Sequence, residues 1–465
     1  MFSDSLRGSW SFSHARRVVF IVLCALVGFP AAAAAAKFPL SIAAPAGGTP
    51  SVLAAGDGGA SIVVWATNPV FDGYGPLTVD TIKAGPAPAR RRWSTSRSLL
   101  AGVARDRAGD LDLLTMLSSP ARGSDAPRLV LYRARQNGGV RRVWSAGASR
   151  QATIARRGKR LAIAWIQTVA GHGTGPVRFV LQFVTSPDGR SFTRPRAVEH
   201  VLPSWLGDQG AGFVTDLALT LDAGGSPVVA LTASRRRAPT LVLASLTPSG
   251  RVRARELTPG VDGLVDAHTT AGGRVAVIVE DTGIEGEDGE CVSDHQPRQI
   301  WGTVREPHAD HFGPVVVLDS GPYSCADSAA QLVTNAGERP AVLWGSAAAA
   351  PQTPPTVKLA IAELGKPLGP PATIASGALL RTATYHDGGM LFAVTTRPTD
   401  TTNPHGGPLV LQAITSGSGV GPLEPVDAAG AQVVLSDTTD NGTDSLIAWQ
   451  PTGSRDLHMT GFGGQ

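Results

Sequence analysis

The sequence predicts an all-β fold, a single β-propeller built of four-stranded antiparallel blades. Glycine (55 residues) and proline (35) are abundant among the 465 residues, which favours many turns and short strands. A hairpin-like segment also recurs along the chain, and several of its copies end in tryptophan. A recurring period of this length indicates a repeat architecture, and four strands per period is typical of a propeller blade.

The clearest copies of the repeat pair a glycine turn with an alternating apolar strand. They read GGASIVVWATN, GKRLAIAWIQT, GERPAVLWGSA and GTDSLIAWQPT, and their tryptophans are Trp65, Trp165, Trp344 and Trp449. The gaps between them fit two, three and two periods of roughly 50 to 60 residues. Because each tryptophan occupies the same position of the second strand, we expect these side chains to pack between adjacent blades.

The intervening copies are weaker but recognisable. They read AGDLDLLTMLSS near Asp110, GGSPVVALTAS near Ser226, GGRVAVIVEDT near Arg274 and GGMLFAVTTRP near Met390. Two further strand-like runs follow most copies, for example RLVLYRARQ from Arg128. The sequence therefore predicts eight blades, with seven as the alternative if one weak repeat, such as the second, packs irregularly.

The two ends of the chain predict how the ring closes. The last repeat, from Ala431 to Gln465, has room for only three strands. FPLSIAAPAGG (Phe38 to Gly48) is similar to GPLEPVDAAG, the fourth strand of the preceding repeat. We expect the N-terminal strand to complete the last blade, so that no sheet edge is left open there.

The first 36 residues have the pattern of a signal peptide. His14, Arg16 and Arg17 precede an apolar run from Val18 to Phe29, and alanines follow up to Ala36. The apolar run is shorter than the roughly 20 residues that span a bilayer, which favours cleavage over retention as an anchor. We therefore expect a propeller domain over residues 37–465, secreted or associated with the cell envelope, with no transmembrane segment after cleavage. The arginine- and alanine-rich composition is typical of a GC-rich bacterium.

The cysteines fit an oxidising compartment. Cys24 lies in the signal segment, which leaves Cys291 and Cys325 as a predicted disulfide. The net charge of +4 comes from arginine, with clusters at 90–92, 141–142 and 235–237. Aromatic residues are not interleaved with these clusters as a nucleic-acid surface would require, so we expect no nucleic-acid partner.

The predicted topology places the long loops on one face. Loops between second and third strands, and those between blades, emerge together and are long, whereas the other turns are tight. A ligand on this face would meet residues of these loops. The candidate ligand-binding residues are Trp205, Asp208, Tyr74, His172 and His405. Trp205 is the candidate for stacking on a sugar.

One loop gathers carboxylates between the predicted fifth hairpin and Cys291. Its candidate calcium ligands are Glu280, Asp281, Glu285, Glu287 and Asp288. Calcium takes six to eight oxygen ligands, but the order of ligands and glycine matches no EF-hand loop. A solvated acidic loop is the alternative, and the sequence requires no cofactor.

SPDGRSF, from Ser186 to Phe192, resembles the Asp box of sialidase-like β-propellers, which is close to Ser-x-Asp-x-Gly-x-x-Trp. Ser186, Asp188 and Phe192 match, whereas the glycine comes one place early and the motif is one residue short. The resemblance implies a structural turn between third and fourth strands, away from the active face. We expect Asp188 to accept hydrogen bonds from turn amides and Phe192 to pack between sheets.

The catalytic motifs of sialidases are absent from the sequence. It contains no Arg-Ile-Pro motif, and none of its four tyrosines is flanked as a nucleophile would be. We therefore expect a monomeric, non-catalytic module that binds a glycan or an envelope protein. The alternative is a carbohydrate-active hydrolase or lyase of sialidase-like type, which a pair of acids in a deep axial pocket would favour.

Overall fold

A computed structural model describes most of the chain after residue 39. The described residues are 40–55, 60–66, 74–83, 89–106, 109–118, 127–149, 151–169, 178–198, 202, 213–234, 240–261, 263–281, 297–322, 330–334, 339–346, 354–386, 389–396, 407–415, 419–428, 430–438 and 444–463. They form strands and turns, and no helix occurs among them. Accordingly, no helix in this part of the chain is long and apolar enough to cross a membrane. The predicted signal peptide and the three cysteines lie outside the described residues.

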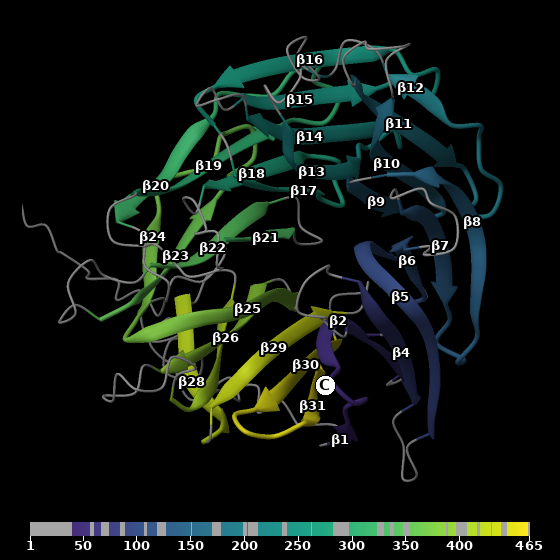
Figure 1. Ribbon diagram of the computed structural model, residues 1–465. Coiled ribbons are helices and arrows are strands. Elements are labelled where there is room, and N and C mark those ends of the chain that lie inside the picture. The colour runs from purple at the N-terminus through teal and green to yellow at the C-terminus, as the bar shows by residue number, and fades with distance from the viewer. Residues whose placement is uncertain are drawn as a thin grey trace, which may run out of the picture.

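All strands pair antiparallel, and most belong to four-stranded sheets (Figure 1). One sheet contains β9 (Gln151–Arg157), β10 (Arg160–Val169), β11 (Arg178–Ser186) and β12 (Arg196–Val198). The next contains β13 (Phe213–Leu221), β14 (Pro227–Ser234), β15 (Thr240–Leu246) and β16 (Val252–Pro259). It is followed by β17 (Leu264–Thr269), β18 (Val275–Asp281), β19 (Pro297–Arg305) and β20 (Val316–Pro322).

Three further sheets continue the same order along the chain. The first contains β21 (Gln331–Thr334), β22 (Pro340–Ser346), β23 (Thr356–Ile361) and β24 (Ala372–Ser376). The second contains β25 (Ala378–His386), β26 (Gly389–Thr396), β27 (Leu409–Thr415) and β28 (Gly419–Asp427). The third contains β29 (Ala431–Thr438), β30 (Asp444–Pro451), β31 (Asp456–Gly463) and β1 (Leu40–Ala43).

The remaining sheet has seven strands because one long strand serves both of its parts. It contains β2 (Thr49–Ala55), β3 (Ala60–Ala66), β4 (Gly75–Lys83), β5 (Ala89–Arg105), β6 (Leu111–Leu117), β7 (Arg128–Ala134) and β8 (Val140–Ala148). Residues 89–95 of β5 pair with β4, whereas residues 98–105 pair with β6. The weak second repeat of the sequence therefore continues the first sheet through β5.

The sheets are arranged around a common axis, as in a β-propeller (Figure 1). We call the first strand of each repeat its inner strand: β2, residues 98–105 of β5, β9, β13, β17, β21, β25 and β29. The last strand of each repeat is its outer strand: residues 89–95 of β5, β8, β12, β16, β20, β24, β28 and β1. Inner strands contact one another from β5 through β9, β13, β17, β21, β25 and β29 to β2.

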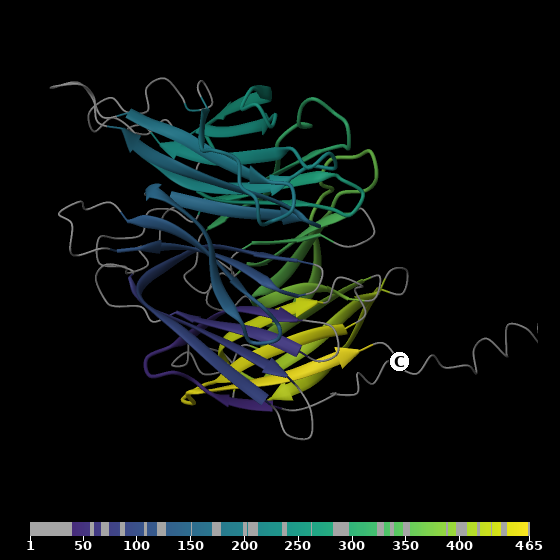
Figure 2. The same cartoon turned by 90° about the vertical axis from the view of Figure 1, so that its right-hand side faces the viewer.

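Strands from the two ends of the described chain lie side by side (Figures 1 and 2). β1 pairs with β31, with Leu40 opposite Met459 and Ala43 opposite Asp456. The sequence predicts this pairing from the missing fourth strand of the last repeat, and the strand pairing confirms it.

The core is divided among the contacts between sheets. The described residues form eight clusters of buried apolar side chains, and seven of them join two neighbouring sheets. The eighth lies between the two parts of the seven-stranded sheet. Alternation of side chains along each strand lets one sheet contribute to two clusters, one on each of its faces. The cluster around Trp65 joins the seven-stranded sheet to the sheet formed by β29, β30, β31 and β1.

The four repeat tryptophans are core residues, which confirms the prediction. Trp65, Trp165, Trp344 and Trp449 are all buried. Three of their indole nitrogens donate to aspartates: Trp65 to Asp80 at 2.7 Å, Trp344 to Asp319 at 2.6 Å and Trp449 to Asp427 at 2.8 Å. The last two bonds reach the outer strand of the preceding sheet, so they link sheets as well as pack the core.

The Asp-box-like turn forms where the sequence predicts it, between β11 and β12. Asp188 Oδ1 accepts hydrogen bonds from the amides of Arg190 (2.8 Å) and Ser191 (2.7 Å), and these bonds hold the pKa of Asp188 well below its ordinary value. Gly189 adopts φ +66°, and its carbonyl accepts a hydrogen bond from Arg133 of β7 at 2.9 Å. Phe192 packs against Trp144 of β8, so both expectations for this turn are confirmed.

Tight turns join the inner strands β9, β13 and β17 to the strands that follow them. In the β13–β14 turn, Asp222 Oδ1 accepts from the amide of Ser226 at 2.9 Å. Gly273, in the β17–β18 turn, adopts φ +93°, and a Cβ atom there would lie 2.4 Å from that of Ala223. Glycine is needed at this position both for its conformation and for the close approach of two sheets.

Candidate binding site

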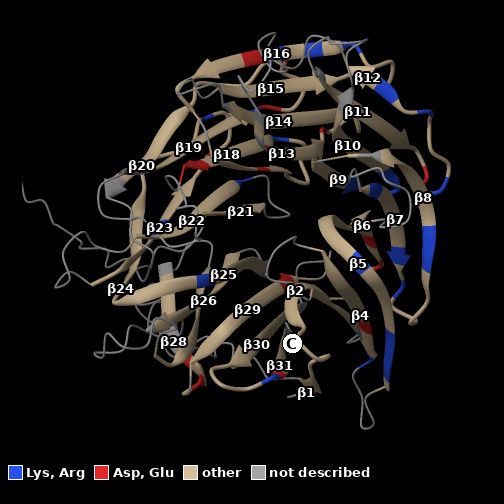
Figure 3. Cartoon of the chain, in the orientation of Figure 1, with Lys and Arg blue, Asp and Glu red and all other residues tan. Residues whose placement is uncertain are grey.

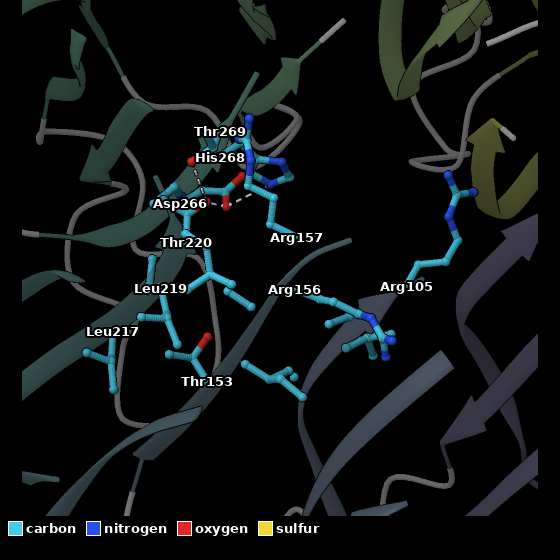
Figure 4. A pocket seen from close by; sticks show the side chains of 18 of the residues that line it. Arg105, Thr153, Arg156, Arg157, Leu217, Leu219, Thr220, Asp266, His268 and Thr269 are labelled. Atoms are coloured by element: carbon cyan, nitrogen blue, oxygen red, sulfur yellow. Dashed lines mark hydrogen bonds and ion pairs between the residues drawn. The ribbon is translucent and has the colours of Figure 1, made fainter. Parts of the chain in front are cut away.

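A cavity opens between four consecutive inner strands (Figure 4). Its volume is about 350 Å³, and its walls come from β5, β9, β13 and β17. The lining residues belong mainly to the C-terminal part of each strand, ending at Arg105, Arg157, Leu221 and Thr269. The cavity therefore lies towards the tight turns between first and second strands.

The strand pattern explains why polar groups line this cavity. Successive side chains of a strand point to opposite faces, so an inner strand packs alternate residues against its neighbours and presents the others to the axis. On β17, Asp266 and His268 are two residues apart and both half-exposed, whereas Val265 and Ala267 are buried. The sequence of this strand, LVDAHT, thus supplies both a core contact and an acid–imidazole pair.

Asp266 and His268 form an ion pair in the cavity. Their Oδ1 and Nε2 atoms are 3.2 Å apart. The carboxylate of Asp266 raises the pKa of His268 against the opposing effect of burial. Burial also opposes ionisation of Asp266, but the charge of His268, together with hydrogen bonds from its imidazole and from the amide of Ala267, lowers the pKa of Asp266. Since both side chains are nearly half-exposed, water screens the pair and its contribution to stability is small.

Two of the three lining arginines are neutralised by carboxylates. Arg156 binds Asp112 of β6 and lies 3.4 Å from Asp106, which both belong to the preceding repeat. Arg105 binds Asp437 of β29 and donates to the carbonyl of Ala55 at 3.4 Å. These side chains join the inner strands at the edge of the cavity, so their charges serve the contacts between sheets.

Arg157 differs because its described hydrogen-bond acceptors are main-chain carbonyls. It donates to Thr270 at 3.0 Å and to Ala271 at 2.8 Å, in the turn after β17. The side chain thus extends from the end of β9 past β13 to the β17–β18 turn. Burial lowers the pKa of Arg157, and the charge of Asp222 partly opposes this effect. An arginine still carries its charge at neutral pH, so Arg157 is the cation of this cavity without a contacting carboxylate among the described residues.

The rest of the lining combines apolar surface with hydroxyl groups. Leu217, Leu219 and Ala155 supply buried apolar side chains. Thr153 lies at the opposite wall from β17 (Figure 4). Thr220 and Thr269 join β13 to β17 through their hydroxyls, 2.8 Å apart. The accessible wall of the cavity is therefore more polar than apolar, and its volume lies within the range of about 300 to 1,000 Å³ that is typical of small-ligand sites.

None of the described residues that line this cavity is a ligand-binding residue predicted from the sequence. Trp205, Asp208, His172 and His405 lie outside the described residues. Tyr74 is described and is partly buried against the apolar cluster between the seven-stranded sheet and the β9–β12 sheet.

The predicted calcium ligands are divided in the same way. Glu285, Glu287 and Asp288 lie outside the described residues. Glu280 was expected on an acidic loop, but it belongs to β18 and is buried, and its Oε2 accepts a hydrogen bond from the amide of Ala330 at 2.7 Å. Asp281 is the last residue of the same strand. The interpretation of Glu280 as a loop residue is therefore wrong, since its carboxylate links two sheets.

No group of three metal-ligating side chains occurs among the described residues. The predicted partners Cys291 and Cys325 lie outside this part of the chain, so the disulfide stays a prediction. Sequence reasoning missed Arg157, Asp266 and His268, which lie on inner strands rather than in long loops. The signal that could have found Asp266 and His268 is the charge at alternate positions of LVDAHT within an otherwise apolar repeat.

Comparison with known proteins gives low similarity throughout. No family model matches the chain, and no curated protein matches it. An acylaminoacyl peptidase of Pyrococcus horikoshii is 8% identical at a TM-score of 0.41, and the match covers 90% of this chain and 52% of the peptidase. The chain thus spans about half the length of that protein.

Two carbohydrate-active proteins are similarly distant. The polysaccharide lyase Uly1 is 8% identical at a TM-score of 0.41, with 78% of this chain and 89% of the lyase covered. The NanB sialidase of Streptococcus pneumoniae is 9% identical at a TM-score of 0.36, with 91% and 93% covered. Similarity at this level carries no inference about activity, so the function is argued from the chain's own residues.

Proposed function

We propose that the protein is a non-catalytic, extracytoplasmic binding module whose axial cavity takes an acidic sugar. The proposal combines one eight-bladed propeller over residues 37–465 with a cationic ligand site between its inner strands. The observation that carries the ligand class is Arg157, whose described acceptors are the main-chain carbonyls of Thr270 and Ala271.

The eight-blade count is supported by the distribution of the core. Each of the eight apolar clusters lies at one contact between consecutive repeats, including the contact inside the seven-stranded sheet. If β5 serves as the outer strand of one blade and the inner strand of the next, every blade has four strands. Pairing of β1 with β31 then completes the last blade and closes the ring.

An anionic ligand fits the charge of the cavity. Arg105 and Arg156 bind Asp437 and Asp112, and Asp266 is paired with His268, whose pKa its carboxylate raises. Arg157 is the lining cation without a contacting carboxylate among the described residues, so a carboxylate or similar group gains a charge-assisted hydrogen bond there. The threonine hydroxyls around it suit the hydroxyls of a sugar, which is why we propose an acidic glycan rather than a simple anion.

A binding role is supported over glycoside hydrolysis by the number of carboxylates. Hydrolases of most glycosidase families place two carboxyl groups about 5 to 9.5 Å apart around the scissile bond. The described lining of the cavity contains one carboxylate, Asp266, which His268 holds in an ion pair. We therefore propose a secreted or envelope-associated monomer that needs no cofactor, with a glycan or glycan-bearing envelope component as its partner.

Calorimetric titration with trigalacturonate and with the matching neutral galactose trimer tests the proposal. We expect the wild type to bind the acidic trimer more tightly. Arg157→Gln should weaken that binding about 10- to 100-fold, which corresponds to the loss of hydrogen bonds to a charged group. Arg160→Gln is the matched control, because Arg160 also donates to a carbonyl of a neighbouring turn, that of Gly224, but does not line the cavity.

Three outcomes would contradict the proposal. In the first, Arg157→Gln binds the acidic trimer as tightly as the wild type while circular dichroism shows that both are folded. This result would show that Arg157 is not part of the ligand site. Equal weakening by Arg160→Gln would show a general charge effect. Release of reducing ends from trigalacturonate by the wild type would replace the binding module with the hydrolase alternative.

A further inference from the structure

Arginine is concentrated on the outer strands of one half of the ring (Figure 3). Residues 89–95 of β5, β8, β12 and β16 carry eight arginines and one acid, Glu256. The arginines are Arg90, Arg91, Arg92, Arg141, Arg142, Arg196, Arg253 and Arg255. The other outer strands, β20, β24, β28 and β1, carry no lysine or arginine and three acids: Asp319, Glu424 and Asp427.

Some of these arginines are already engaged inside the protein. Arg90 and Arg92 bind the buried carboxylate of Asp80, at 2.6 and 2.9 Å. Arg253 lies 3.5 Å from Asp310. The arginines that could bind an external partner are therefore the ones on these outer strands that make no ion pair within the protein.

Exposed arginines without partners lie on three consecutive outer strands. Arg141 and Arg142 are on β8, Arg196 is on β12 with Arg194 just before it, and Arg251 directly precedes β16. All five are exposed, and within the described part of the chain none of their side chains makes an ion pair or hydrogen bond. We call these five residues the outer arginine arc.

Protection of sheet edges does not account for the arc. Charged side chains on an edge strand do prevent another strand from pairing with it. The outer strands β20, β24 and β28 are edges of the same kind, yet they have no cation. The acids of β20 and β28 show that a protected edge does not need arginine, so the one-sided distribution of the cations requires another explanation.

The shape of the arc indicates the form of its partner. β8, β12 and β16 belong to consecutive repeats and follow the convex outer rim of the ring (Figures 1 and 3). A flat membrane surface touches a convex rim at one place and cannot reach all three strands together. A flexible linear polyanion can bend along the rim and contact each strand in turn.

The aromatic residues near the arc favour a polysaccharide over a single-stranded nucleic acid. Single-stranded nucleic acids bind by stacking bases on exposed aromatic side chains. Trp144, the aromatic residue of β8, packs inward with its ring centroid 5.8 Å from those of Trp165 and Phe192. Guanidinium groups alone suit carboxylate or sulfate groups, which they bind through two parallel hydrogen bonds.

From these observations we infer that the outer arginine arc binds a linear acidic polysaccharide along the rim of the ring, independently of the axial cavity. The contact is electrostatic and distributed over three repeats. It therefore strengthens with the length of the polymer and weakens with salt.

The test compares long polygalacturonate with trigalacturonate by fluorescence anisotropy at several salt concentrations. We expect Arg141→Gln/Arg142→Gln/Arg196→Gln to bind the polymer at least 10-fold more weakly at low salt. The slope of log affinity against log salt should become less steep by about two, since each of the three lost contacts contributes on the order of 0.7. The control, Arg339→Gln/Lys366→Gln/Arg455→Gln, removes the same charge from exposed positions in the other half of the ring and should bind like the wild type.

Several results would overturn the inference. One is that the arc variant, Arg141→Gln/Arg142→Gln/Arg196→Gln, binds the polymer as tightly as the wild type. Another is that the control variant loses as much affinity for the polymer as the arc variant, which would show only an effect of net charge. Tighter binding of oligothymidylate of equal charge would identify a nucleic-acid surface, and tighter binding to anionic lipid vesicles a membrane surface. Trigalacturonate binding distinguishes this site from the cavity, because Arg157→Gln should weaken it and the arc variant should not.

Discussion

The two halves of the ring share one strand plan, but some of the contacts between their repeats differ in chemistry. In the first half, from β2 to β16, a buried carboxylate joins two repeats: Asp112 binds Arg133 at 2.7 Å and also binds Arg156. In the second half, from β17 to β31 with β1, hydroxyls join inner strands, as between Thr382 and Ser436 at 2.7 Å.

This difference explains where the cavity forms. Hydroxyl pairs such as Thr384 and Thr438, 2.9 Å apart, draw neighbouring inner strands together with short side chains. The long arginines of the first half reach across gaps between strands, as Arg157 does between β9 and the β17–β18 turn. Charge and open space thus occur together where β5, β9 and β13 of the first half meet β17 of the second half, and both favour a polar ligand there.

The largest expected effect comes from breaking the buried charge cluster. Asp112→Ala leaves Arg133 and Arg156 without their shared carboxylate, and both arginine side chains are 6% exposed. Burial opposes the charge of Arg133, and Asp112, with Asp106 and Asp110, raises its pKa against this effect. We expect a loss of about 3 to 5 kcal/mol in the free energy of unfolding, measured by urea denaturation.

The matched change in the second half is Thr382→Val. It removes a neutral hydroxyl that bonds Ser436 and should cost about 1 kcal/mol. A cost for Asp112→Ala no greater than that for Thr382→Val would show that the two halves are held together equally. The charged contacts would then contribute no more to the free energy of unfolding than the neutral ones.

A smaller effect is expected at the repeat tryptophans. Trp344→Phe removes the 2.6 Å hydrogen bond to Asp319 and leaves that carboxylate with Lys358 at 3.1 Å. We expect a loss of about 1.5 to 3 kcal/mol, since the acceptor is charged. Trp165→Phe in the first half chiefly weakens the ring contact with Trp144 and should cost about 1 kcal/mol.

Thermal unfolding of both variants measures this difference. The melting temperature should fall further for Trp344→Phe than for Trp165→Phe, although the same atoms are removed from the same repeat position. If the two melting temperatures fall equally, the tryptophans act through packing alone and the hydrogen bond to the preceding sheet adds nothing.

The elements that could be predicted from the sequence are those fixed by local patterns. Glycine turns, alternating apolar strands and the shared position of Trp65 and Trp344 predict hairpins and core without any knowledge of distant contacts. The pairing of β1 with β31 was predictable because the last repeat lacks a strand. The role of Asp188 was predictable because the amides that donate to its carboxylate lie within three residues of it along the chain.

The cavity could not be predicted because it depends on contacts between repeats. Arg157 reaches a turn more than a hundred residues away, and nothing in its own hairpin indicates that destination. Glu280 was misplaced for the same reason, since its partner Ala330 lies in the next sheet. Long loops drew attention to Trp205 and His172, whereas the cavity of the described residues is lined by inner strands.

The smallest effect is expected at two turns between third and fourth strands, one in each half of the ring. In the first half, Asp188 accepts hydrogen bonds from two turn amides. The corresponding turn between β19 and β20 is closed by main-chain bonds, from Ala309 to Glu306 at 3.1 Å and from Gly313 to Val304 at 2.9 Å. Its aspartate, Asp310, is exposed and lies near Arg253.

Asp188→Ala should therefore lower the melting temperature slightly at neutral pH, and Asp310→Ala should not. The pKa of Asp188 is lowered in the folded protein, so its stabilisation is present above the unfolded pKa near 4 and is lost as pH falls through the folded value. The difference between wild type and Asp188→Ala should shrink as the pH is lowered below about 4. A difference that stays constant with pH would assign the effect to the shape of the turn rather than to its carboxylate, and the two halves would then differ here in sequence only.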